Sequence, residues 1–330
     1  MNAKKIVLLV VVAVLISTGF YNNSRGLIET AFYEHWQEVF EIFVVGRLNL
    51  SQQDGIFSSG GLLVLGEADD LDVSNKVVNA QYDSYKEDRV FGKYWVYKST
   101  PGLSGFLLSV FDKVTNFSPG YNLKLFRIGV SWLNGFVFAC LIFWFVEEIG
   151  WLAGLLNLLF ISYSPWLILL GGNIYWQLWV FYLPLVIILF WLKFISDYGV
   201  DYPTRKMLWC LFAITLLKIL ITGFEFITAF LLMLTVPFVF YALKDKWVFK
   251  IFFKRAYKIG FSLLAAAISG LFVLSIQITA VGGGYINALR YIFYAFGKRT
   301  FGDGQAYVEP YASAIRASFF DVFKKYLQGP

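Results

Sequence analysis

The sequence predicts an all-α polytopic membrane protein with about seven transmembrane helices and a large external first loop. Hydrophobic residues make up 58% of the 330 positions and charged residues 15%, far from the balance of a soluble domain. A helix needs about 20 mostly apolar residues to cross the bilayer core. Segments of this kind lie at 6–20, 128–146, 151–170, 175–192, 207–222, 224–243 and 259–281.

These segments divide the chain into four parts. They are an N-terminal transmembrane anchor (1–20), an external loop with interfacial helices (21–127), a transmembrane bundle (128–281) and an external C-terminal segment (282–330). A signal peptide is the alternative for the first part, but Ser17-Thr18-Gly19-Phe20 is a poor cleavage site. We therefore expect an uncleaved anchor.

The placement of lysine and arginine predicts the orientation, because cytoplasmic loops are rich in both. Lys4 and Lys5 place the N-terminus in the cytoplasm, and alternate crossings then place the basic linkers at 193–206 and 244–258 on the same side. The first loop is external and holds thirteen acidic against nine basic residues between positions 21 and 124. The net charge of +6 thus reflects the inner face, and we expect membrane lipids rather than nucleic acid as partners.

The external loop opens with an amphipathic helix. Apolar residues recur at helical spacing from Ile28 to Val44, with Glu29, Glu34, Glu38 and Glu41 on the opposite face. This face suits the membrane interface or the neighbouring helices equally well.

Glycine and serine then predict a loop from position 46 to 61. Asp54 in this loop either accepts a proton from an acceptor hydroxyl or belongs to an ordinary Asp-Gly turn.

A cluster of carboxylates follows. It comprises Glu67, Asp69, Asp70 and Asp72. Such a cluster binds a divalent cation, holds one carboxyl group protonated, or forms a solvated loop. The aromatic run at 93–98 ends in Lys98 and resembles a carbohydrate or headgroup surface as much as an interfacial aromatic belt.

Two features of the bundle need explanation. Asn173, Tyr175 and Trp176 lie in a very short external turn that would face the first loop. Lys218 and Glu225 lie on one helix face if the helix continues through Gly223, whereas a break there places Glu225 near the outer interface.

Several short strings resemble those of bacterial GT-C membrane glycosyltransferases, as does the arrangement of one anchor, a large external loop and a bundle with short turns. The strings are Gln53-Asp54-Gly55, residues 97–105, Ser164-Pro165-Trp166 with residues 173–176, and Gly223-Phe224-Glu225-Phe226. The resemblance spans most of the chain.

The resemblance implies a hexosyl- or pentosyltransferase that moves a sugar from a polyprenyl phosphate to a glycan, lipid or protein acceptor outside the cell membrane. The acidic residue of the family's first loop maps to Asp54 as the base. Family members often carry paired acids there, so Glu67 and Asp69 are the alternative. No cofactor is implied with certainty, and Asp69, Asp70 and Asp72 would serve a divalent cation if transfer depends on one.

The resemblance also implies a cationic group for the lipid phosphate. Lys98, Lys298 and Arg299 are candidates, and the remaining candidates for substrate binding are Arg47, Gln53, Asn173, Tyr175, Trp176 and Glu225. GT-C enzymes commonly continue beyond the last segment found here, which makes a truncated chain one interpretation. A polysaccharide polymerase or flippase and a non-catalytic remnant are the alternatives. The isolated positions of Arg47 and Arg89 favour the transferase over the polymerase.

Overall fold

The computed structural model describes residues 3–58, 60–66, 75–87, 89, 93–115, 117–199, 205–301 and 317–328. The predicted acid cluster, comprising Glu67, Asp69, Asp70 and Asp72, lies outside these residues. Lys298 and Arg299 belong to a described helix, but their side chains are not described.

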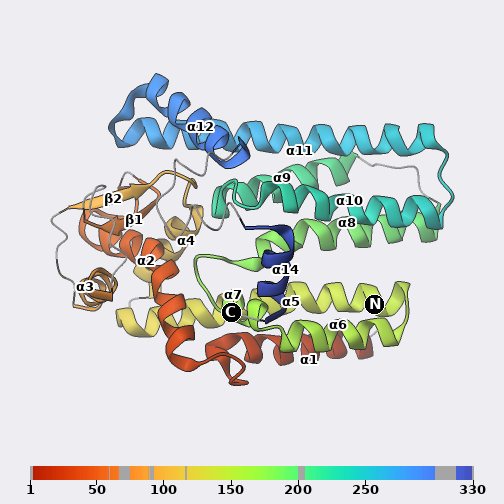
Figure 1. The fold of residues 1–330 in the computed structure, drawn as a ribbon, viewed down its shortest axis with the longest axis horizontal. Helices are drawn as coiled ribbons and strands as arrows, with labels where there is room; N and C mark the ends of the chain where they lie inside the picture. Colours follow the sequence, from red (N-terminus) through yellow and green to blue (C-terminus); the bar gives the residue numbers. More distant parts are fainter. Residues whose placement is uncertain are drawn as a thin grey trace.

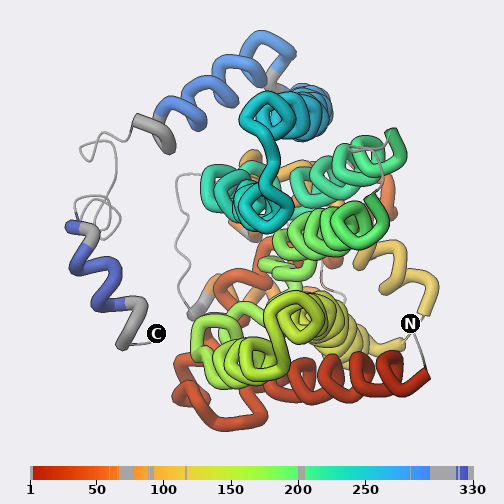
Figure 2. The backbone as a smooth tube through the Cα atoms, turned by 90° about the vertical axis from the view of Figure 1, so that its right-hand side faces the viewer, coloured from red at the N-terminus to blue at the C-terminus, as the bar shows by residue number. Residues whose placement is uncertain are grey.

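Among the described residues, seven helices of 13 to 30 residues, together with the short helix α7, form one elongated bundle (Figure 1). They are α1 (Ala3–Phe20), α5 (Pro119–Glu148), α6 (Trp151–Tyr163), α7 (Pro165–Gly171), α8 (Leu178–Tyr198), α9 (Arg205–Thr222), α10 (Ile227–Lys244) and α11 (Phe249–Ile278). Seen along the helices, α1 lies at one side with α5 and α6 above it, and α11 lies at the other side (Figure 2). A π-turn, η3 (Thr279–Gly283), leads from α11 to α12 (Gly284–Phe301), and α14 (Phe319–Gln328) follows.

Several of these helices are long and apolar enough to span a membrane, as the sequence predicts. Five qualify singly, namely α1, α5, α8, α10 and α11, and α6 with α7 forms a sixth candidate that is bent by 66°. Helix α9 is only 18 residues long and carries Arg205, Lys206 and Lys218, so it is not among these candidates.

The bend corrects the prediction of one continuous helix over 151–170. The helix is interrupted at Ser164. The Ser164 hydroxyl accepts a hydrogen bond from the Leu167 N–H at 3.4 Å and so caps α7. Pro165 is the first residue of α7, a position that needs no N–H donor. The same two residues therefore end one helix and begin the next.

Ion pairs join the helices at the end of the bundle where the N-terminus lies (Figure 1). Lys5 Nζ lies 2.5 Å from Glu147 Oε1, and Lys193 Nζ lies 2.9 Å from Glu148 Oε2. Lys244 also pairs with Glu148. Lysines from three other segments thus neutralise the acidic turn between α5 and α6, and these segments all meet at one end.

The long helix α2 and several short elements gather at the opposite end of the bundle (Figure 1). They are α2 (Thr30–Asp54), β1 (Leu62–Leu65), α3 (Asn75–Lys86), β2 (Tyr94–Tyr97) and α4 (Leu103–Thr115), preceded by the short helix η1 (Tyr21–Asn23). We call α2, β1, α3, β2 and α4 the cap. The strands pair antiparallel with Leu62 opposite Tyr97. Buried Val44, Leu48 and Tyr85 pack with Leu123 and Phe126 of α5, so the cap and the bundle share a core.

Helix α2 corrects the prediction of a loop that begins at position 46. It continues to Asp54, because Gly46 packs inside the cap and does not interrupt the helix. A Cβ atom at Gly46 would collide with the carbonyl group of Leu63 in β1. The glycine therefore allows helix and strand to approach closely. Glu41, placed on the polar face by the sequence, is fully buried, which is a second correction.

The arrangement yields a test of orientation. A cysteine introduced at the exposed Asp83 in the cap is expected to react with a membrane-impermeant thiol reagent added to intact cells. A cysteine at Asp245, beside the basic end of α10, is expected to react only after the membrane is permeabilised. Labelling of Asp245→Cys from outside would show that the predicted orientation is wrong.

Candidate functional site

Glu225 lies where the cap meets the bundle, and two tyrosines donate hydrogen bonds to it. Its Oε1 accepts from the Tyr97 hydroxyl at 2.7 Å and from the Tyr175 hydroxyl at 3.0 Å. Tyr97 ends β2, Tyr175 precedes α8, and Glu225 lies between α9 and α10. Three segments that are far apart in the sequence therefore meet at one carboxylate.

The turn that carries Glu225 is fixed by a glycine. Gly223 has a φ of +65° directly after α9, and a Cβ atom there would collide with the Ser99 carbonyl oxygen. Thr100 donates a hydrogen bond to the Ile221 carbonyl at 3.2 Å, which holds the cap against the end of α9. The helix thus breaks at Gly223, as one of the two sequence interpretations expects.

Lys218 supports this turn without pairing with the Glu225 side chain. It is completely buried, and its Nζ donates to the backbone carbonyls of Gly223 at 3.0 Å and Glu225 at 2.8 Å. The ammonium also lies 4.7 Å from the centre of the Phe181 ring, a cation–π contact. The ammonium of Lys218 therefore binds the backbone carbonyls at the C-terminal end of α9. The Glu225 carboxylate accepts its hydrogen bonds from the two tyrosines instead.

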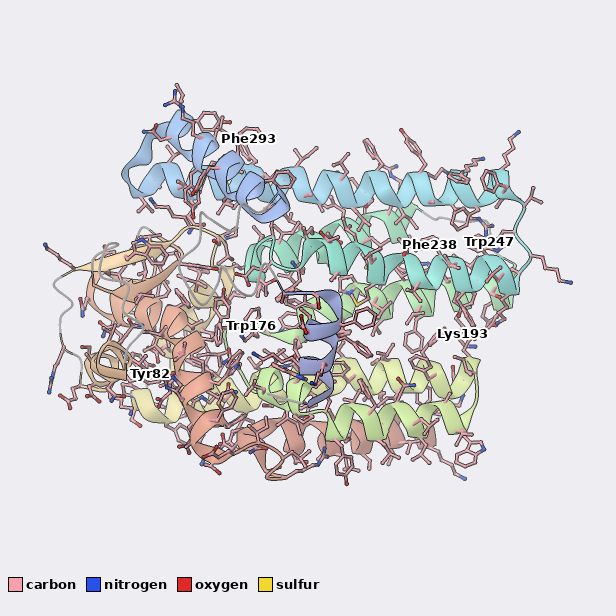
Figure 3. The ribbon with its side chains drawn as sticks, viewed as in Figure 1. Tyr82, Trp176, Lys193, Phe238, Trp247 and Phe293 are labelled. Carbon is pink, nitrogen blue, oxygen red and sulfur yellow. The ribbon has the colours of Figure 1, made fainter. Side chains whose placement is uncertain are left out.

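Aromatic rings enclose the tyrosine side of the site. Phe43 lies 4.7 Å from Tyr97 and 5.5 Å from Tyr175, measured between ring centres. Trp176 lies between the rings of Phe40 and Phe226, at 5.3 and 5.7 Å. Figure 3 shows Trp176 in the middle of the molecule, far from Lys193 at the basic end.

This enclosure sets the protonation of both tyrosines. Burial, and then the nearby Glu225 carboxylate, raises the pKa of Tyr97 to about 12. The same two causes raise the pKa of Tyr175 far above its ordinary value. Both phenols therefore stay protonated at neutral pH and donate to the carboxylate. Glu225 is half-buried, and its Oε2 accepts no hydrogen bond from the described residues, so one oxygen is available to another hydroxyl group.

A buried ion pair holds α2 against the turn that carries Tyr175. Arg127 of α5 donates to Glu41 through Nε at 3.0 Å and Nη2 at 2.5 Å. The Tyr82 hydroxyl and the Ile174 N–H also donate to this carboxylate, at 3.1 and 3.3 Å. Figure 3 places Tyr82 in the cap. The pair therefore joins α2, α3, α5 and the turn before α8.

Asn173 supports the same turn from within. Its Oδ1 accepts hydrogen bonds from the N–H groups of Tyr175 at 2.9 Å and Trp176 at 3.2 Å. Its Nδ2 donates to Gln37 Oε1 at 2.9 Å, and Gln37 donates to the Leu169 carbonyl at 2.6 Å. These bonds fix the position of Tyr175 relative to the cap.

An apolar groove of about 340 Å³ lies beside the Ser99–Gly102 turn. Leu103 and Phe106 of α4 line it from the cap, and Leu220 and Val273 line it from α9 and α11. Gln277 of α11 closes one side when its amide is oriented to satisfy both neighbours, because it then donates to the Pro101 carbonyl and accepts from the Gly61 N–H. The groove and Glu225 therefore flank the same turn of the cap.

The structure places the predicted residues of the first loop in different settings. Asp54 is the exposed last residue of α2 and makes no hydrogen bond or ion pair with other described residues. Gln53 donates to Asn49 Oδ1 at 2.6 Å and to the Arg89 carbonyl at 2.7 Å. Lys98 lies 5.7 Å from the centre of the Tyr291 ring of α12.

Arg47 has a structural task. Its guanidinium, nearly buried, donates to the carbonyls of Ile56, Ser58 and Gly60 at 2.7 to 2.9 Å. These bonds hold the segment that follows α2 and lines the groove. Arg47 was predicted to bind substrate. In the structure its guanidinium is already hydrogen-bonded to backbone carbonyls.

The Glu41–Arg127 pair was not predicted from the sequence. The available signal was Arg127 itself, a lone arginine directly before a predicted span, for which a buried carboxylate is the expected partner. Asp112 was missed as well. It accepts hydrogen bonds from the Tyr85 hydroxyl at 2.5 Å and from Asn122 Nδ2 at 2.7 Å, and so joins α3, α4 and α5.

Within the part of the chain that the structure describes, no three histidine, cysteine or acidic side chains are grouped so that they could hold a metal ion. No family model, curated protein or solved structure matches the chain.

Proposed function

We propose that the chain is a multi-pass protein of the cell membrane with its N-terminus in the cytoplasm and its cap outside. Arg205 and Lys206 begin α9, Lys244 ends α10 and Lys246 follows it, which fits the enrichment of basic residues at the cytoplasmic ends of membrane helices. Helix α9 runs beside α8 and α11 and would supply the seventh crossing.

We propose that the protein is a GT-C-like glycosyltransferase that moves a sugar from a polyprenyl phosphate to an acceptor hydroxyl outside the membrane. One observation carries this proposal. Three of the strings that resemble GT-C enzymes, far apart in the sequence, meet at Glu225 through Tyr97 and Tyr175. A carboxylate with one oxygen held and the other available is suited to act as a general base.

In the proposed reaction the acceptor hydroxyl attacks the anomeric carbon of the donor. The bond between that carbon and the phosphate oxygen breaks, and polyprenyl phosphate leaves. Glu225 Oε2 accepts the hydroxyl proton while the tyrosines hold Oε1. Asp54, favoured by the sequence, is the second candidate for the base, because the segment directly after it lines the groove.

The apolar groove supports a lipid donor. It is lined by cap residues on one side and by Leu220 and Val273 of the membrane helices on the other, so an isoprenoid chain could enter it from the bilayer. Thr100 and Gly102 separate this groove from Glu225. A donor whose lipid lies in the groove would have to extend its phosphate-linked sugar past this turn to reach the carboxylate.

The test is an assay with the purified full chain in lipid nanodiscs. Polyprenyl-phosphate hexoses and pentoses serve as donors, and a lipid extract of the bacterial envelope supplies acceptors. We expect a glycosylated product together with released polyprenyl phosphate, and no product from a nucleotide sugar alone. Transfer from a nucleotide sugar without the lipid donor, or release of polyprenyl phosphate without a product, would contradict the proposal.

A further inference from the structure

Helix α12 begins where α11, a candidate membrane span, ends. The apolar stretch that qualifies as a span covers Phe249–Gly282, and η3 turns the chain from it into α12. Gly282 and Gly284 have φ values of +112° and +65°, which glycine adopts readily, and so allow this turn. Figure 2, which looks along the bundle, shows α11 end-on and α12 running across the view. With α11 crossing a membrane, α12 therefore lies along the membrane surface.

One face of α12 is packed, and its contacts place the helix at the cap end of the bundle. The Tyr291 ring lies 5.7 Å from Nζ of Lys98, the residue that follows β2 of the cap. This face forms a small apolar core with α11 and with the turn that carries Glu225. The residues of this core are Ala288, Tyr291, Ile292, Leu274, Ile278 and Phe224. The helix is thus anchored at the outer end of α11 in the proposed orientation.

The opposite face of α12 is apolar and exposed. Ile286 and Phe293 are two turns apart and so lie on the same face, with 67% and 72% of their surface exposed. Tyr285, Tyr294 and Phe296 are exposed as well. Figure 3 shows Phe293 at the margin of the molecule. Aromatic side chains are enriched where a membrane meets water, so this face has the composition of an interfacial helix.

The charges of α12 favour one class of lipid. They are all basic, namely Arg290, Lys298 and Arg299. Arg290 lies four positions after Ile286 and three before Phe293, so it belongs to the exposed face, and it forms no ion pair with the described residues. Basic residues are normally concentrated at the cytoplasmic ends of membrane helices. A helix with only basic charges at the outer end of a span therefore needs an anionic partner.

We propose that the exposed face of α12 lies in the headgroup layer of the outer leaflet and binds anionic phospholipid. Ile286 and Phe293 reach the acyl chains, and the Arg290 guanidinium donates to the lipid phosphate. A phosphatidylcholine headgroup balances its phosphate with its own ammonium, whereas phosphatidylglycerol keeps a net negative charge. This inference rests on the proposed membrane orientation and not on glycosyl transfer.

The test measures which lipid surrounds α12 in the purified full chain in nanodiscs. A fluorescent probe is attached to Gly297→Cys, because Gly297 follows Phe293 by four positions and a Cβ atom there meets open space. Cys140 and Cys210 are replaced by alanine so that the probe has one attachment site. Quenching by brominated phosphatidylglycerol or brominated phosphatidylcholine gives the relative affinity of the two lipids for α12. We expect at least a roughly five-fold preference for phosphatidylglycerol, reduced in about 0.5 M salt.

Arg290→Gln is expected to lower this preference roughly five-fold, because a basic residue near an anionic surface contributes about 1 kcal/mol. Lys113→Gln, which removes an exposed charge from α4, is the matched control and should leave the preference unchanged. Phe293→Ser should weaken quenching by both lipids, because it removes an apolar side chain from the exposed face. Monodisperse elution shows that each variant is folded.

Two reference positions distinguish the role of α12 from the membrane topology. A probe at Ile268→Cys, exposed on α11, should be quenched by both lipids, and a probe at Asp83→Cys in the cap by neither. Absence of quenching at Ile268→Cys would contradict the topology, and the proposal with it.

With Ile268→Cys quenched, three results at Gly297→Cys would overturn the proposal alone. They are no quenching, equal quenching by both lipids, and an Arg290→Gln variant as selective as the wild-type helix. Protection of the probe that disappears in nanodiscs holding a single chain would show that a second copy covers this face instead of lipid.

Discussion

The Glu225→Gln variant is expected to transfer sugar roughly a hundred-fold more slowly than the wild-type protein, or worse, because losing a general base costs about that much. Glutamine keeps the shape of the side chain and a carbonyl oxygen for Tyr97 and Tyr175, so the protein should accumulate normally. The measurement is the initial rate in nanodiscs with donor and acceptor saturating, together with the yield of monodisperse protein.

Asp54→Asn is the matched comparison, because it neutralises an exposed carboxylate that forms no hydrogen bond or ion pair with other described residues. We expect a much smaller loss of rate from this change. Tyr97→Phe removes one of the two donors to Glu225 and should lower the rate without affecting the yield. A normal rate in Glu225→Gln with a large loss in Asp54→Asn would make Asp54 the base, as the sequence alone favours.

Glu41→Gln is expected to lower the free energy of unfolding by about 3–5 kcal/mol, the usual cost of leaving one partner of a buried ion pair without the other. Glu41 is completely buried, and its carboxylate accepts from Arg127, Tyr82 and the Ile174 N–H. An amide in its place would turn an NH₂ group toward these donors. Unfolding of the detergent-solubilised protein by heat or denaturant measures the loss.

Two further variants interpret this result. Glu34→Gln, on the same helix but exposed, should change stability by less than about 0.5 kcal/mol, as surface substitutions usually do. The double variant Glu41→Gln/Arg127→Gln should recover part of the loss, because no charge is then left without its partner. Wild-type stability in Glu41→Gln would show that the ion pair does not hold α2 to the bundle.

Hydropathy was enough to predict several helices that are long and apolar enough to span a membrane, because a long apolar run has few other stable environments. It could not predict how the cap folds. The segment around Gly46 has the composition of a loop, yet it is helical, because β1 packs against the glycine through contacts that only the folded cap provides. Pro165 was apparent in the sequence, but the bend that it and Ser164 produce between α6 and α7 was not predicted.

The candidate site was predictable in its parts and not in its assembly. Tyr97, Tyr175 and Glu225 all lie in strings that the sequence singles out. That they meet depends on the pairing of β2 with β1, on the turn at Asn173 and on the break at Gly223. From the sequence, Lys218 was therefore a possible partner of the Glu225 side chain. Because the chain turns at Gly223, Lys218 instead donates to backbone carbonyls.

The acidic turn at Glu147 and Glu148 bears on the order in which the protein assembles. In a chain made from its N-terminus, Lys5 is already present when Glu147 emerges, so α1 and α5 can join early. Glu148 must wait for Lys193 and Lys244, which are made after it. Until α8 and α10 have been made, the hairpin of α5 and α6 therefore carries an uncompensated negative charge at Glu148. Lys193 and Lys244 compensate that charge once α8 and α10 have packed beside α5.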